Sequence, residues 1–426
     1  MVYVQNQLGQ PLMPTKNHRK VRLLLNSGTA VVVKRTPFTI RLTTRSKTYV
    51  QPIILGMDAG SKTIGLSAST EAEELFAAEV TPRNDVVDNL STRREFRHAR
   101  RNRRTRHRKP RFNNRVRSKH KGWLAPSVEV KIQEHITAIK RVCALLPVGR
   151  VVVETAEFNL QLLKAVEAGL PVPQGEDYQK GEMLGHYNVR QFVLWKDNYA
   201  CQCCGAHGKG VKFHLHHLEG RKTGGNAPDN LMTLCDECHK KFHRGIITPD
   251  ILKKRKRRST RDAAFMGVMR KTLLERLQAE LPIRIVETKG YITKYTRVEH
   301  LKLDKTHTND ALAIAQGRRG FGVKELTAIP QSDYIYHIRP VRHHNRQLHK
   351  ATILPGGIRK NNQAPRYVRG FRLFDKVSYL GKDCFIWGRR NSGRFLLKLL
   401  DGTKVKDGVN CKHISILERS TNYLIS

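Results

Sequence analysis

Two C-x-x-C pairs lie between widely separated acidic residues, and this nesting constrains the fold more than any other feature. The pairs consist of Cys201, Cys204, Cys235 and Cys238. Two such pairs form the usual frame of a tetrahedral structural zinc site. Asp58 and Glu154 end apolar segments before the pairs, and Asp310 follows them. A compact cluster between the second and third members of a scattered set of acids predicts a module inserted into a split domain.

The charge of the chain favours a polyanionic partner. Its 426 residues include 79 Lys and Arg against 36 Asp and Glu, a formal net charge of +43. Such an excess is typical of proteins that bind nucleic acid, and a ribosome-associated protein would also fit it. No apolar run approaches the roughly 18 to 20 residues of a spanning helix, and the N-terminus has no signal-peptide pattern. We therefore expect a soluble cytoplasmic protein with no membrane partner.

The most basic segment, residues 92–121, has fifteen Arg or Lys and the single acid Glu95. A run of like charges is usually a disordered arm, because the charges repel one another. Arg is nevertheless a good helix former, and the segment lacks Gly/Ser-rich character. We predict a long helix whose charge a nucleic-acid backbone neutralises, with the disordered arm as the alternative.

The remaining sequence alternates strand and helix patterns. In the first 80 residues we expect strands at 2–4, 30–33, 38–42, 53–57, 63–69 and 75–80, a helix at 17–26, and Pro11-Leu12-Met13-Pro14 in the first loop. Further on we expect helices at 127–146, 251–281 and 310–317, a buried strand at 151–153 and another strand at 283–286. Short strands at 376–380, 384–389, 394–400, 404–406 and 413–417 predict a small C-terminal β-barrel, with Asp401-Gly402 as a hairpin turn.

The segment between the two cysteine pairs carries residues that a structural zinc site does not need. They are His216, His217 and Asn230, and His239 follows the last cysteine directly. This set resembles the ββα-metal site of HNH nucleases. The resemblance implies that His217 is the general base, that His216 and His239 bind Mg²⁺, and that Asn230 fixes the loop that holds the base. His243 is a competing ligand for this ion, whereas Cys203, inside the loop of the first cysteine pair, is a competing ligand for zinc. A purely structural zinc finger is the alternative.

The scattered acids form a second candidate site. Asp58 ends an apolar strand before a Gly turn, Glu154 ends another strand, and His307 and Asp310 share one helical face through their i, i+3 spacing. Three converging carboxylates can hold two Mg²⁺ ions at a phosphodiester. The alternative is that each acid pairs with one of the many basic residues. Together, in strand, strand and helix contexts, the acids resemble a RuvC-type RNase H fold.

With both sites considered, the chain closely resembles IscB, a transposon-encoded RNA-guided nuclease family related to the CRISPR type II effectors. The resemblance rests on Pro11-Leu12-Met13-Pro14, on 56–65 and 154–158 as the first two RuvC motifs, on 199–239 as the HNH module and on 289–310 as the third RuvC motif. Asn159 departs from the expected Asp, and no large recognition lobe is present.

The resemblance implies a multidomain α/β architecture, in which a split RNase H-like (RuvC) domain carries an inserted bridge helix and an inserted HNH module. The implied segments are an N-terminal α+β PLMP domain at 1–50, RuvC parts at 51–91, 126–158 and 251–325, an Arg-rich bridge helix at 92–125, a small RNA-contacting or linker insertion at 159–187, the HNH nuclease with structural zinc at 188–250, and the C-terminal β-barrel at 326–426.

The resemblance also implies the activity and the partners. A structured guide RNA would pair with double-stranded target DNA, HNH would cut the guide-paired strand, RuvC would cut the displaced strand, and the barrel would read a target-adjacent motif. The implied RNA contacts are Arg93, Arg94, Arg97, Arg100, Arg101, Arg103, Arg104, Arg106 and Arg108. We expect a monomeric ribonucleoprotein in a prokaryotic cytoplasm, at the nucleoid when DNA-bound. A zinc-stabilised, non-catalytic RNA-binding protein and a guide-independent HNH/RuvC nuclease are the alternatives.

Overall fold

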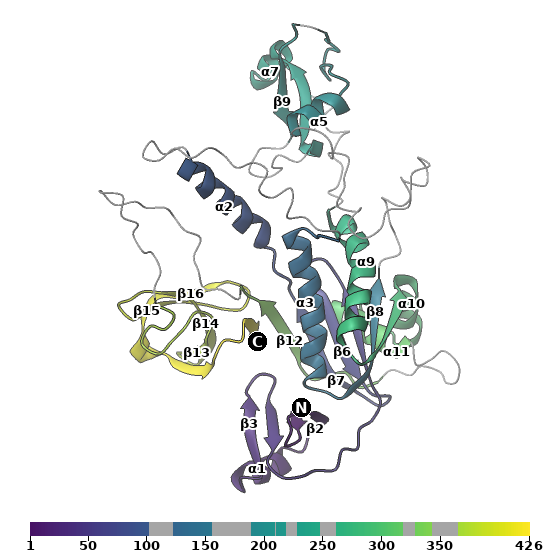
Figure 1. The fold of residues 1–426 in the computed structure, drawn as a ribbon, viewed down its shortest axis with the longest axis vertical. Coiled ribbons are helices and arrows are strands. Elements are labelled where there is room, and N and C mark those ends of the chain that lie inside the picture. The colour runs from purple at the N-terminus through teal and green to yellow at the C-terminus, as the bar shows by residue number, and fades with distance from the viewer. Residues whose placement is uncertain are drawn as a thin grey trace. The chain divides into compact units, whose positions relative to one another are not determined.

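A computed structural model describes residues 1–101, 122–155, 189–208, 210–218, 228–247, 261–317, 329–342 and 365–426. The chain forms two compact units (Figure 1). The first unit contains Met1–Asn159 and Phe265–Ser426, and the second contains Leu160–Ala264. The second unit therefore interrupts the first in sequence.

The N-terminal residues of the first unit form a four-stranded sheet in the order β2-β1-β4-β3. Its elements are β1 (Val2–Gln5), β2 (Pro11–Thr15), α1 (His18–Asn26), β3 (Ala30–Lys34) and β4 (Thr39–Leu42). The prediction that Pro11-Leu12-Met13-Pro14 lies in a loop is wrong, because these residues form most of β2 and pair with β1. Since β2 is an edge strand, its prolines need not donate a hydrogen bond to another strand.

The first unit is organised around a seven-stranded sheet, here called the central sheet, in the order β11-β8-β5-β6-β7-β12-β18. Its strands are β5 (Ile53–Ala59), β6 (Ile64–Ser69), β7 (Glu74–Val80), β8 (Val148–Thr155), β11 (Arg284–Lys289), β12 (Ile335–Pro340) and β18 (Tyr423–Ile425). Strands β5, β8 and β11 run parallel, whereas β6 is antiparallel to both β5 and β7. The strands predicted at 53–57, 63–69, 75–80, 151–153 and 283–286 are confirmed as β5, β6, β7, β8 and β11. The sequence analysis did not identify β12 and β18, which lie within its 326–426 segment.

One face of the central sheet packs against α11 (His307–Gly317) at very short range. A Cβ atom at Gly56 would overlap the carbonyl oxygen of Ala311, and one at Gly65 would overlap that of His307. Gly56 and Gly65 lie on the same face as Asp58, because side chains alternate along a strand and Asp58 pairs with Gly65. The two glycines therefore allow the first turn of α11 to lie beside Asp58.

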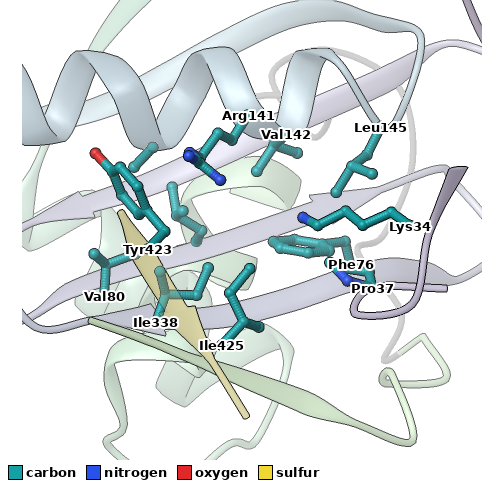
Figure 2. Close-up of a pocket in the computed structure, with 12 residues that line it drawn as sticks. Lys34, Pro37, Phe76, Val80, Arg141, Val142, Leu145, Ile338, Tyr423 and Ile425 are labelled. Carbon is teal, nitrogen blue, oxygen red and sulfur yellow. The ribbon is translucent and has the colours of Figure 1, made fainter. Parts of the chain in front are cut away.

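The opposite face is covered by α3 (Pro126–Cys143), which buries Ile132, Ile136, Ile139 and Val142 as predicted. A small pocket remains where this helix meets the strands, lined by side chains that include Leu145, Phe76 and Ile425 (Figure 2). Two cations border the pocket. The Arg141 guanidinium lies 3.7 Å from the centre of the Tyr423 ring, and burial together with Arg141 lowers the pKa of Lys34 to about 8.

The helix α2 (Val86–Arg101) begins six residues before the predicted start of the bridge helix at 92, so the basic segment begins inside this helix. Residues 102–121, which include Arg103, Arg104, Arg106 and Arg108, lie outside the described part of the chain. The described residues that follow, 122–125, are not helical. Gly122 adopts a φ of +77°, and Ala125 is extended, as the residue before a proline usually is.

After the inserted unit, the chain returns through α9 (Arg261–Glu280), β11, α10 (Gly290–Tyr295) and η4 (Thr296–His300). The C-terminal region then forms a five-stranded antiparallel sheet in the order β16-β15-β14-β13-β17. Its strands are β13 (Lys376–Tyr379), β14 (Lys382–Arg389), β15 (Arg394–Lys398), β16 (Lys404–Asn410) and β17 (Ser415–Glu418). The strand number and the hairpin at Asp401-Gly402 match the prediction.

The second unit contains a small ββα arrangement. The antiparallel strands β9 (Phe213–His217) and β10 (Leu231–Cys235) pair, and α7 (Asp236–His243) follows β10 directly. A helix α5 (Val189–Lys196) packs on this hairpin through Phe192 and Val193 against Leu231. The short 3-10 helix η3 (Pro228–Asn230) enters β10. The adjacent His216 and His217 lie on β9, and His239 lies in α7.

We predict that Gly56→Ala destabilises the first unit by about 1–3 kcal/mol, because the added methyl group must push α11 away from β5. Gly149→Ala in β8 is the matched control, since a Cβ atom there would meet only the Ile53 carbonyl oxygen at 3.9 Å. Thermal unfolding followed by circular dichroism measures both variants. Equal melting temperatures for the two variants would contradict the proposed close contact.

Candidate active sites

The first candidate site, called the acid site below, lies at one end of the central sheet. Asp58 on β5 pairs in register with Glu154 on the parallel neighbour β8, so both carboxylates leave the same face. His307, the first residue of α11, places its Nδ1 atom 2.6 Å from the Asp58 Oδ2 atom. Asp310 lies one turn further along α11. The fold therefore brings together all four residues predicted for this site.

Burial and mutual repulsion characterise the acid site. Burial raises the pKa of Glu154, and the neighbouring Asp58 and Asp310 raise it further, while a hydrogen bond with Thr293 of α10 opposes the shift. Burial and Asp58 also raise the pKa of Asp310, against the opposing effect of Arg297. Acids in such an arrangement disfavour their own ionisation and would be stabilised by a cation. The site thus has the charge and the oxygen donors that suit Mg²⁺.

Two residues that the sequence analysis missed complete the acid site. The Arg297 Nε atom lies 2.7 Å from the Asp310 Oδ1 atom, and the Arg297 side chain is largely buried. The backbone at Gly290 approaches the carboxylate of Glu154 so closely that a Cβ atom there would lie 3.2 Å from Oε1. Gly290 is the first residue of a helix that directly follows a strand, and this pattern in the sequence could have indicated its close contact with Glu154.

His307 serves as a second positive partner. Its hydrogen bond with Asp58 raises the pKa of the imidazole. In the described part of the chain, groups of three or more ligand atoms within 4.8 Å of one another occur only among cysteines and histidines of the second unit. The carboxylates of Asp58, Glu154 and Asp310 are therefore neighbours whose oxygen atoms do not all lie within that distance of one another.

The second candidate site, called the histidine site, is in the ββα arrangement of the second unit. His216 of β9 and His239 and His243 of α7 bring their ligand atoms within 4.8 Å of one another. The Nε2 atoms of His239 and His243 are 3.3 Å apart, as expected for residues one helical turn apart on one face. The structure therefore gathers both predicted ligands and also His243, the competing candidate.

The state of His216 fits a metal ligand. Its side chain is buried, and its Nε2 atom has no hydrogen-bond partner in the part of the chain that is described. Burial, followed by the neighbouring His239 and His243, lowers the pKa of His216 to about 4. A buried polar nitrogen without a partner is unfavourable, and a neutral imidazole is the form that binds metals. A divalent cation bound at this position would give the His216 Nε2 atom a partner.

Other residues support the histidine site. The His214 ring stacks on His239 with centroids 4.8 Å apart, and its Nε2 atom lies 2.8 Å from the Asp236 Oδ1 atom. His217 follows His216 along β9 and so leaves the opposite side of the strand. The Asn230 carbonyl accepts a hydrogen bond of 2.9 Å from the Leu218 N–H and thereby holds the segment after His217. These positions suit the roles predicted for His217 and Asn230.

The four cysteines of the two C-x-x-C pairs form a separate cluster in the same unit. The sulfur atoms of Cys201, Cys204, Cys235 and Cys238 lie within 4.8 Å of one another, and Cys203 is exposed and outside the group. Burial and the neighbouring thiols raise the pKa of Cys238. Four gathered thiols with no counter-charge are the donor set of a tetrahedral zinc site. This arrangement supports zinc as the structural ion.

Comparison with known proteins adds two family matches. Residues 2–181 match the family described as RRXRR protein, and residues 201–245 match the family described as HNH endonuclease. The chain is an IscB- and Cas9-like protein. The predicted resemblance is therefore confirmed, and the HNH match contains all seven residues of the two clusters, four cysteines and three histidines.

More distant similarities complete the comparison. The protein Anaredoxin of Nostoc sp. (strain PCC 7120 / SAG 25.82 / UTEX 2576) is 36% identical over 67 residues, which are 16% of this chain and 86% of that protein. A crystal structure of Streptococcus thermophilus Cas9 in complex with the AGAA PAM aligns at 14% identity and a TM-score of 0.33, covering 53% of this chain and 30% of that chain. The Type II-C Cas9 of Actinomyces naeslundii aligns at 10% identity and a TM-score of 0.22, covering 88% and 77%.

The IscB- and Cas9-like chain thus spans less than a third of the length of the Streptococcus Cas9 that it matches. Among its described helices, none is both long and apolar enough to cross a membrane.

We predict that Cys238→Ser removes one tightly bound zinc ion and lowers the melting temperature of the second unit, because the tetrahedral cage loses a ligand. Cys203→Ser is the matched control, since this exposed cysteine lies between the ligands Cys201 and Cys204 and is outside the cluster. Metal analysis of the dialysed proteins, together with calorimetry, measures the outcome. Loss of zinc from the control as well would show that the ligand set is wrong.

Proposed function

We propose that this IscB- and Cas9-like protein is an RNA-guided DNA endonuclease with two cutting centres. The observation that carries the proposal is the presence, in one chain, of an HNH region with a gathered histidine site and a separate acid site on the central sheet. A single hydrolytic centre would need only one of them. Two centres suit a target with two strands.

The acid site supports an RNase H-like RuvC assignment for the central sheet. Its strands β7-β6-β5-β8-β11 combine a meander with two parallel strands, and the acids lie on neighbouring strand ends and on a helix. Bound Mg²⁺ ions would stabilise the attacking and leaving oxygens of a phosphodiester. In this assignment Asp58, Glu154 and Asp310 are the Mg²⁺ ligands. His307, hydrogen-bonded to Asp58, is placed to hold or transfer a proton.

The histidine site supports hydrolysis by a different arrangement. We assign metal binding to His216 and His239, with His243 as a third ligand. His217, on the other side of β9, would accept a proton from the attacking water. Asn230 would keep His217 in place through the backbone of the segment that follows it. The cysteine cluster ties the 201–204 turn to the end of β10 and to α7, and we assign it no part in the reaction.

The net charge of the chain and its family match both support nucleic acids as partners. The RRXRR match covers the basic segment, and the net charge of +43 suits a guide RNA and a DNA duplex. We propose that Arg93, Arg94, Arg97, Arg100, Arg101, Arg103, Arg104, Arg106 and Arg108 bind the guide RNA and that the C-terminal five-stranded sheet reads a short DNA motif. The HNH region would cut the guide-paired strand, and the acid site the displaced strand.

The test uses purified protein, guide RNA, Mg²⁺ and a matched duplex with each strand labelled differently. We predict that Asp58→Ala abolishes cutting of the displaced strand alone. His217→Ala should slow cutting of the guide-paired strand alone by roughly 10²–10⁴-fold, the usual contribution of a general base. His207→Ala is the control, because this exposed histidine of the same unit lies outside both clusters.

The outcomes separate the competing functions. If either substitution abolished both cuts while RNA binding persisted, the assignment of two centres would be wrong. Cutting without any RNA would indicate a guide-independent nuclease. RNA binding with no Mg²⁺-dependent cutting would indicate a zinc-stabilised RNA-binding protein.

A separate experiment tests the RNA contacts. We predict that replacing Arg100, Arg101, Arg103 and Arg104 by Ala weakens RNA binding and flattens its salt dependence, with each lost phosphate contact removing about 0.7–0.9 units of log–log slope. Filter binding at a series of salt concentrations measures the slope. Replacing the same residues by Lys keeps the charge and should keep the slope. An unchanged slope in the Ala variant would mean that the segment does not contact RNA.

A further inference from the structure

His135 is a fully buried histidine on α3 whose ring reaches the acid site from the opposite face of the central sheet. Its Nε2 atom lies 3.2 Å from the carbonyl oxygen of Gly60, and its Nδ1 atom lies 2.7 Å from that of Lys131. Gly60 is the second residue after Asp58. The ring therefore links a helix to the turn that follows the acidic residue.

The turn after β5 is tightly closed. The Gly60 N–H contacts the Asp58 carbonyl oxygen at 3.2 Å, and a Cβ atom at Gly60 would overlap the carbonyl oxygen of Thr63. A small displacement of Gly60 therefore moves the backbone of Asp58 with it. The Gly60 carbonyl has His135 as its hydrogen-bond partner in the described part of the chain.

The ring itself has little freedom to move. The Lys131 carbonyl lies one turn before His135 in α3 and contacts Nδ1, while Phe265 of α9 packs near the ring with centroids 6.3 Å apart. The Lys131 carbonyl already accepts the helical N–H of residue 135, whereas the Gly60 carbonyl would lose its partner without the ring. Both ring nitrogens face carbonyl oxygens, and a neutral ring has one N–H to donate, so it can hydrogen-bond only one of the two carbonyls. We place this N–H at Nε2, where it bonds the carbonyl that receives no helical N–H.

We propose that His135 is a positioning residue of the acid site, which donates a hydrogen bond from Nε2 to the Gly60 carbonyl and so fixes the turn that presents Asp58. This inference rests on the proposed function of the acid site. The side chain touches neither substrate nor metal. It acts through the backbone between Gly60 and Asp58, and a misplacement of about 1 Å at a reacting centre can cost on the order of 10²-fold in rate.

Two substitutions separate hydrogen bonding from packing. His135→Phe keeps a ring of similar size but has no donor, whereas His135→Gln places an amide N–H near the position of Nε2. Ile139→Val on the same buried face of α3 is a packing control with no polar link to the turn. The strand-specific assay provides an internal control as well, because the histidine site lies in the other compact unit.

We expect His135→Phe to slow cutting of the displaced strand by on the order of 10²-fold and to raise the Mg²⁺ concentration needed for half-maximal cutting, with the guide-paired strand cut at the normal rate. His135→Gln and Ile139→Val should stay close to the wild type. The proposal is overturned if His135→Phe cuts the displaced strand normally, if His135→Gln is as slow as His135→Phe, or if both strands slow together.

The unmodified protein and Asp58→Ala are measured in the same assay. If the unmodified protein leaves the displaced strand intact, or if Asp58→Ala cuts it normally, the proposed function of the acid site has failed. If these two behave as expected and the His135 variants do not, only the positioning role has failed.

Discussion

The close approach of α11 to β5 and β6 is the contact on which the acid site depends. Asp58 and Glu154 are neighbours simply because they occupy paired positions on parallel strands. His307 and Asp310 come from a helix about 250 residues later in the chain, and they reach Asp58 only because Gly56 and Gly65 leave space for the helix backbone. A larger side chain at either position would collide with the backbone of α11 and push the helix, with His307 and Asp310, away from the sheet.

The acid site gathers carboxylates that repel one another, and the second unit gathers thiols and imidazoles. Different interactions hold each group of side chains together. In the acid site, Arg297 and His307 offset the repulsion between half-buried carboxylates, and paired strands fix the spacing of Asp58 and Glu154. The second unit is small, and its core cluster of buried residues includes three of the four clustered cysteines. A metal held by those thiolates would contribute folding energy that so few apolar residues cannot supply. The histidine site then needs only one strand and one helix.

The sequence predicted the acids, the clustered cysteines and the histidines because each belongs to a local pattern: a strand end, a C-x-x-C pair or a helical spacing. It did not predict Arg297, whose role depends on how η4 returns toward α11, or His135, whose pattern on α3 is that of an ordinary buried position. It also missed β18, because three residues at the end of a chain carry too little periodicity to indicate which sheet they join. The prolines of β2 indicated a loop, and only the sheet order shows that this edge tolerates them.

The location of the inserted unit has a physical explanation in the central sheet. The unit lies between β8 and β11, which are adjacent and parallel. A parallel pair cannot be joined by a tight turn and requires a crossover of a dozen or more residues, usually helical. The helix α9 supplies this crossover as the chain returns to the first unit. Because the entropy cost of closing a flexible loop grows only with the logarithm of its length, lengthening a connection that is already long costs little. The same insertion within the β5–β6 turn would instead disturb the hairpin that carries Asp58, so the crossover is the position where a second unit can be added while the acid site is kept.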